Sequence, residues 1–199
     1  MFYIYRITFF HNNVLVVLRK CCIFAKYLHY NMIKVTVKDN DLRAAAAQGM
    51  DEFVGVFVTA INNAIGGQLT AENMAQLNAD QVTLLAYITL RDEMMDGGMV
   101  QLIHNGYGPF IFQNPFARVM KVWGVNDLGK LIYSANKLYR QHHEAIERDC
   151  NEDEFMALFE KFPCFDDIDD SFVENEERFT AQIAEYIDNN IEKFAEIEQ

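Results

Sequence analysis

The sequence predicts a single compact all-α domain built from short, capped helices. Residues that cap helices recur directly ahead of apolar stretches, and the apolar residues in those stretches recur at spacings of three and four. Size supports the same conclusion, since 199 residues suffice to bury one core. Hydrophobic residues make up 51% of the chain, too many for general disorder.

The first helix is expected from about Leu42 to Ile65. Asp39–Asp41 can cap its N-terminus, and Gly66-Gly67 can close its C-terminus. Its apolar residues follow the helical period. They are Phe53, Val54, Phe57, Val58, Ile61 and Ile65.

Two further helical segments follow in the next thirty residues. Thr70 is expected to cap a short turn that runs through Leu77. Asn78-Ala-Asp-Gln81 resembles a capping box and predicts a helix to about Met95. Gly97-Gly98 then breaks this helix.

The next three helix boundaries are also marked by asparagine, proline and glycine. Asn114-Pro115 places a cap before a proline, and Gly124 is expected to end the helix that follows. Asn126 is expected to cap the next helix. Asn151 begins a short helix that ends before Pro163.

The C-terminal region is read as an acidic loop, Phe165–Phe172, followed by one last helix. That helix carries a single apolar stripe, which predicts that one of its faces packs on the core. The stripe consists of Phe179, Ile183, Tyr186, Ile187, Ile191, Phe194 and Ile197.

Residues 1–31 differ from the rest of the chain. They are aromatic, β-branched and basic, with four bases and no acid, and charges interrupt every apolar run. They fit neither a membrane span nor a signal peptide. We expect translation to begin at Met32, which leaves 1–31 as an extension outside the domain and 32–199 as one acidic helical domain. A basic interfacial anchor is the alternative for 1–31.

The acidity of the chain belongs to its C-terminal part. The net charge is −12, and residues 144–199 hold nineteen acids against four bases. Such a charge argues against direct binding of nucleic acid or anionic membrane, and favours a basic protein as partner. The four cysteines form no disulfide or zinc pattern, as is typical of a cytoplasmic protein.

No residues in the sequence are arranged for catalysis, for a cofactor or for a metal. His142 and His143 are adjacent, so on a helix they point in different directions and cannot hold one metal together. Neither glycine pair has the basic or hydroxyl partner of a phosphate loop. We therefore expect a protein that is not an enzyme and that acts by binding another protein.

The segment 93–108 is the most unusual stretch of the chain. Gln101 and Asn105 are four residues apart and so share one helix face, with Gly106 and Gly108 allowing sharp turns after it. The two amides could satisfy polar groups where helices meet. Alternatively, they could line a pocket for a small ligand or substrate. Both interpretations stay open from the sequence.

This segment resembles the signature of the DNA-mimic proteins of about nineteen kilodaltons, a family of small acidic bacterial proteins. A second element, Ile168–Phe172, resembles the family's later acidic motif. Asp96 stands where the family usually has Asn, and Leu102 and Ile103 stand where it has aromatics. The motif residues here are Glu93, Asp96, Gly97, Gly98, Gln101, Asn105 and Gly108.

The resemblance implies an all-helical fold, frequent homodimers and, for at least one member of the family, binding to a DNA-binding regulator in place of DNA. The motif is rich in glycine and amides, so we expect it to be structural. Mimicry would need surface carboxylates, although an acidic surface also serves solubility alone. The candidate acidic surface is Asp166, Asp167, Asp169, Asp170, Glu174, Glu176 and Glu177.

Overall fold

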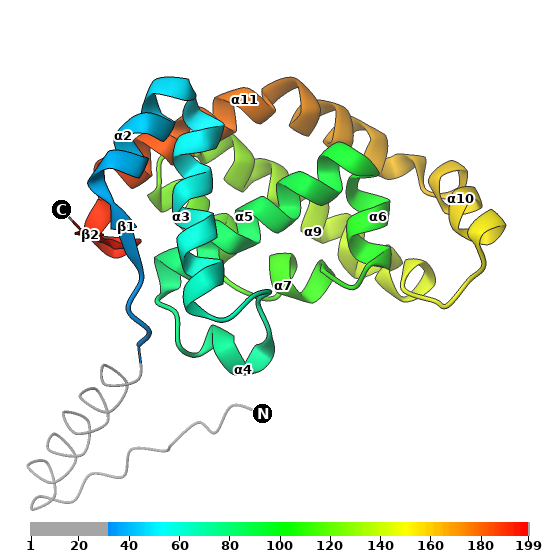
Figure 1. The fold of residues 1–199 in the computed structure, drawn as a ribbon. Helices are drawn as coiled ribbons and strands as arrows, with labels where there is room; N and C mark the ends of the chain where they lie inside the picture. The colour runs from blue at the N-terminus through cyan, green and yellow to red at the C-terminus, as the bar shows by residue number, and fades with distance from the viewer. Residues whose placement is uncertain (1–31, 199) are drawn as a thin grey trace, which may run out of the picture.

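The structure is a computed structural model that describes residues 32–198 (Figure 1). Within this range it has ten α-helices, two 3₁₀ turns and one two-stranded sheet, which confirms the all-α prediction. None of these helices is long and apolar enough to cross a bilayer. The start predicted at Met32 concerns residues 1–31, which lie outside the described range.

The elements follow one another with short connections. In chain order they are β1 (Thr36–Lys38), α2 (Asp39–Gln48), α3 (Met50–Ala64), α4 (Ala71–Met74), α5 (Ala79–Asp96), α6 (Gly98–His104), α7 (Gly108–Phe112), α8 (Phe116–Val122), α9 (Asn126–Ile146), α10 (Glu152–Lys161), η1 (Pro163–Phe165), α11 (Asp166–Asp188), η2 (Ile191–Lys193) and β2 (Glu196–Glu198).

Helix α5 forms the centre of the core. Its residues Thr83–Tyr87 are buried without interruption, which is typical of a helix covered on all sides. Helices α3, α6 and α11 pack against it, and Phe57 and Phe179 contribute large side chains that are almost fully buried. Helix α10 lies at the end of the molecule away from the sheet (Figure 1).

The first predicted helix is in fact two helices. Helix α2 begins already at Asp39, ends at Gln48, and is followed by α3 from Met50. Gly49 between them is extended, with φ 161° and ψ 179°. The expected boundary after the second helix is correct, because Gly66 and Gly67 both have positive φ and follow its last turn.

Most predicted caps are present. Thr70, Asn78 and Asn151 each form a complete capping box with the residue three positions on. Asn114 accepts a hydrogen bond from the backbone N–H of Phe116, at the start of α8. The predictions for Asp39–Asp41 and for Asn126 are wrong, because these residues lie inside α2 and α9 and their side chains make no cap.

The predicted acidic loop is wrong too, because Asp166–Phe172 form the first two turns of α11. Ile168 and Phe172 are buried on one side of it, four residues apart. Carboxylates in a first helical turn are favourable, since they face the positive end of the helix dipole. The acids that suggested a loop therefore stabilise a helix start.

The last helix ends earlier than predicted. It ends at Asp188, and Phe194 belongs to the segment after the 3₁₀ turn, where it is fully buried. Strand β2 then pairs in parallel with β1. The cap residues of α5 hold this tail, since Asn78 Nδ2 donates to the carbonyl of Lys193 and Gln81 Nε2 donates to that of Phe194.

Candidate functional site

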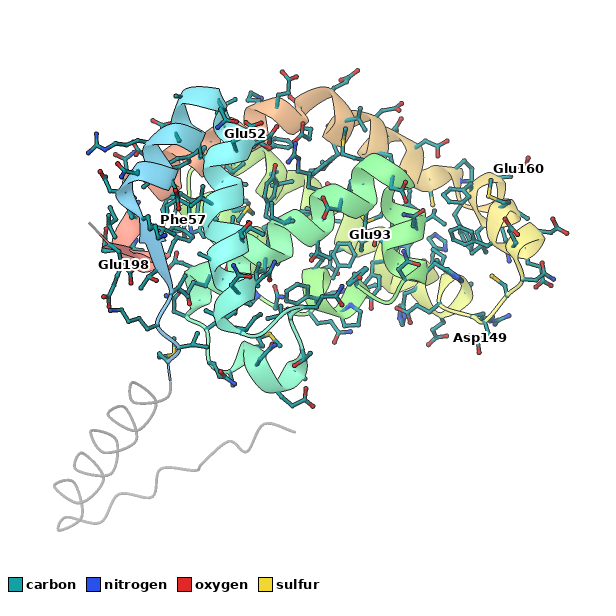
Figure 2. The ribbon with its side chains drawn as sticks, in the orientation of Figure 1. Glu52, Phe57, Glu93, Asp149, Glu160 and Glu198 are labelled. Atoms are coloured by element: carbon teal, nitrogen blue, oxygen red, sulfur yellow. The ribbon has the colours of Figure 1, made fainter. Side chains whose placement is uncertain are left out.

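The amides of the 93–108 motif bind the motif's own carboxylates. Gln101 Nε2 lies 2.7 Å from Asp96 Oδ2 and 3.2 Å from Glu93 Oε2. Asn105 Nδ2 donates to the same Glu93 oxygen at 2.9 Å. Figure 2 shows Glu93 on α5, beside α6. These bonds join the two helices, so the geometry favours the structural interpretation of the motif.

The motif glycines allow close packing. Gly98 has φ +74°, and a Cβ there would lie 2.5 Å from Asp169 Oδ2 and 2.8 Å from its Cγ. Gly108 lies directly under the ring of Tyr139 and leaves no room for a Cβ. A side chain at either position would displace a neighbour, and at Gly98 it would also strain the backbone.

Asp169 caps helix α6 from a different helix. Its Oδ1 accepts a hydrogen bond of 2.9 Å from the backbone N–H of Met99, in the first turn of α6. Burial is the main cause that raises the pKa of this carboxyl to about 6; the charges of Asp166 and Asp170 contribute to the rise, and the Met99 bond opposes it. Of the predicted surface acids, Asp169 is therefore the one that joins α11 to the motif.

The raised pKa of Asp169 predicts a pH dependence of stability. Because the folded state holds this proton more tightly than the unfolded state, the free energy of unfolding falls as pH rises from about 4 to about 6. Asp169→Asn keeps an acceptor for Met99 and removes the titration. We expect the variant to gain on the order of 1 kcal/mol relative to wild type between pH 4 and 7, the value being limited by solvent screening.

Urea unfolding of both proteins across this pH range measures the difference. A constant difference between wild type and Asp169→Asn from pH 4 to 7 would show that the carboxyl titrates normally. The free energies of both proteins change with their other acids, so only their difference is informative.

Glu176 is buried and does not belong to an exposed surface. It forms an ion pair with Arg91 of α5, and its Oε1 accepts a hydrogen bond of 2.8 Å from Thr180 Oγ1. Thr180 in turn lies 2.6 Å from the hydroxyl of Tyr87. Arg91 also reaches Asp51 of α3 at 3.0 Å. The structure therefore places Glu176 in a polar network that ties α3, α5 and α11 together.

The remaining five predicted acids are exposed on the outer face of α11, and the structure extends this group at its C-terminal end. Glu185 and Asp188 are exposed on the same face, although they lie outside the group predicted from the sequence. Glu185 follows Glu177 by eight residues and Asp188 follows Glu185 by three, and these helical spacings could have revealed them. We name the seven the α11 acidic row: Asp166, Asp167, Asp170, Glu174, Glu177, Glu185 and Asp188.

The acidic row has almost no opposing charge on its own helix. Helix α11 carries nine acids and one base, Arg178. Arg178 donates at 3.0 Å to Asp127 Oδ2 on α9, so its charge is directed towards that helix. Helix α10 adds exposed acids at the end of the molecule, where Figure 2 shows Glu160 and, in the preceding loop, Asp149.

The described residues offer no grouping that suggests metal chemistry. In the 32–198 range, no three His, Cys, Asp or Glu side chains gather where they could hold an ion. His104 Nδ1 lies 2.9 Å from the carbonyl of Ile146, and its ring packs on Phe155. His143 contacts the Glu147 carboxylate at 3.3 Å. These histidines thus have partners within the fold.

Comparison with known proteins identifies the relatives of this chain. Residues 75–190 match the family described as DMP19-like protein. The chain is also similar to the DNA mimic protein DMP19 of Neisseria meningitidis serogroup B (strain ATCC BAA-335 / MC58), with 38% identity over 130 residues. The match covers 64% of this chain and 78% of that relative. On this evidence the chain belongs to the DMP19-like protein family.

Proposed function

We propose that this protein is a DNA mimic, which binds the DNA-binding surface of a basic regulatory protein in the cytoplasm and catalyses no reaction. The observation that carries the proposal is the acidic row on α11. Its carboxylates are exposed on one face of one helix, which carries a single base, Arg178. Membership of the DMP19-like family, with a relative named as a DNA mimic, supports it.

The dimensions of the row suit a protein that normally binds DNA. From Asp166 to Asp188 the helix axis extends about 33 Å, because each residue adds about 1.5 Å. One turn of B-DNA is about 34 Å long. The row supplies one carboxylate per about 5 Å, compared with one phosphate per about 3.4 Å along a single DNA strand. The row thus carries less charge per length than a DNA strand. The acids of α10 and of the loop before it lie at the Asp166 end of the same helix (Figure 2).

A small-ligand or enzymatic function around Gln101 and Asn105 is less well supported. Both amides donate to Glu93, and Gln101 also donates to Asp96. A ligand would have to displace these bonds, which join α5 to α6. We therefore assign the motif to the fold and the acidic row to binding. The homodimer implied by the resemblance remains a separate proposal.

Affinity capture tests this function even before the partner is identified. The protein is immobilised, exposed to a cytoplasmic extract of its own host, and eluted with a short DNA duplex or with an uncharged polymer. We expect DNA-binding proteins to be retained and to leave the column with the duplex, because both ligands occupy one surface. Retention of proteins that duplex DNA does not displace would contradict the proposal.

A variant of the row provides the comparison. Asp170→Asn, Glu174→Gln and Glu177→Gln remove three exposed charges beyond the first turn of α11, where they do not support the helix start. The variant should retain little of the proteins that the duplex elutes from wild type. Equal retention on both columns would show that binding uses another surface.

A further inference from the structure

The acidic row is interrupted at one position by an apolar hollow. Ala181 follows Glu177 by four residues and precedes Glu185 by four, so it occupies the place in the row where a carboxylate would continue the pattern. A hollow of about 450 Å³ opens here between α11 and the junction of α2 and α3. Its apolar walls come from both sides, and include Ala46, Met50, Phe53 and Ala181.

The rim of the hollow is anionic. Glu185 and Asp188 both line it and are exposed, and neither takes part in an ion pair among residues 32–198. Met50 on the opposite wall is 46% exposed. The hollow therefore combines uncovered apolar surface with two exposed carboxylates.

The break at Gly49 gives the hollow its shape. The extended residue Gly49 ends α2, and Met50 begins α3 directly after it. Gly49, Met50 and Ala181 of α11 all line the hollow.

We propose that this hollow binds one arginine side chain of the DNA-binding partner, a step that rests on the proposed function for the partner's identity. The aliphatic part of arginine would cover Met50 and Ala181, and its planar guanidinium would donate to Glu185 and Asp188 at the rim. Arginine fits better than lysine, because its guanidinium group can donate to two carboxylates at once. This group is also more weakly hydrated than the ammonium group of lysine.

This site gives the protein a selectivity that duplex DNA lacks. Phosphates attract every basic side chain, whereas an apolar hollow favours a partner with an arginine at one particular position. Burial of apolar surface depends little on salt, so the hollow adds affinity that persists when the charges of the row are screened. Arginine is one of the residues that often dominate the energy of an interface.

Methyl NMR with a small probe tests the hollow directly. The probe is n-butylguanidinium, which carries the end of an arginine side chain, and the reference is guanidinium itself. We expect butylguanidinium to shift the methyl signals of Met50 and Ala181 with a dissociation constant on the order of 10 mM. Guanidinium should bind at least about fivefold more weakly, because it covers no apolar surface.

Two variants complete the test. Ala181→Leu fills the hollow and should weaken butylguanidinium at least about fivefold, with unchanged helicity by circular dichroism. Glu185→Gln with Asp188→Asn leaves the walls and should weaken both probes. Equal binding of the two probes to wild type, or unchanged butylguanidinium binding in either folded variant, would overturn the proposal. Because no partner is present, failure here leaves the acidic row and its proposed function untouched.

Discussion

Replacing Gly98 by alanine should destabilise the protein by about 3 kcal/mol, which lowers its melting temperature by about 10 °C. Part of the loss comes from the left-handed backbone at φ +74°. The larger part comes from the new Cβ, which would displace the Asp169 carboxylate and with it the hydrogen bond to Met99. Urea and thermal unfolding followed by circular dichroism measure both quantities.

Gly106→Ala is the matched control for this variant. Gly106 has a similar φ of +82°, but a Cβ there would meet nothing within 4 Å. Gly106→Ala should therefore lower the free energy of unfolding only through the strained backbone, by about 1 kcal/mol. Equal losses in the two variants would show that the contact between Gly98 and Asp169 contributes nothing to stability.

Neutralising the middle of the acidic row should weaken binding strongly. In the variant with Asp170→Asn, Glu174→Gln and Glu177→Gln, we expect affinity for the captured DNA-binding protein to fall by about 10- to 100-fold. This follows from about 0.5–1 kcal/mol for each exposed charge pair. The affinity should also depend less on salt between about 50 and 200 mM, because fewer charges attract the partner. Titration calorimetry at several salt concentrations measures both effects.

A control with the same change in net charge separates this surface from general electrostatics. Glu72→Gln, Glu144→Gln and Glu198→Gln remove three exposed carboxylates from α4, α9 and β2. This variant should bind within about threefold of wild type. Charges far from the interface contribute little to affinity, because salt screens their interaction with the partner. An equal fall in affinity for both variants would mean that net charge alone governs binding.

The elements that the sequence predicts correctly are those set by neighbouring residues. Thr70, Asn78 and Asn151 bond residues three positions away, so their capping boxes can be recognised without the fold. The pairing of β1 with β2 joins two three-residue strands from opposite ends of the domain. The alternation of Ile33, Val35 and Val37 with polar residues is typical of a strand, but neighbouring residues cannot reveal its distant partner. The break at Gly49 is equally hidden, since helical apolar spacing continues beyond it.

The first turns of α11 are wrongly predicted because of their aspartates. Aspartate is unfavourable inside helices, and four of them near one another suggest a loop. At a helix start the same residues are favourable. Ile168 and Phe172, four apart and both buried, carry the helical signal within this segment.

The candidate site could be predicted only in part. The sequence locates the acid-rich region, but it cannot tell Glu176 from its exposed neighbours, because the partner Arg91 lies on another helix. Likewise, Asp169 turns inward to Met99 of α6. The two segments that carry the family resemblance, 93–108 and 168–172, thus meet in space through Gly98 and Asp169. Their meeting supports the structural interpretation of both segments.

Competition for a single surface is the most direct test of the proposed mimicry. A fluorescent DNA duplex is bound to the captured DNA-binding protein, and wild-type protein is then added while the anisotropy of the duplex is followed. If the acidic row occupies the DNA-binding surface, the anisotropy should fall to the value of free duplex as binding reaches saturation. Anisotropy that stays constant or rises, as in a complex of all three components, would contradict the proposed function.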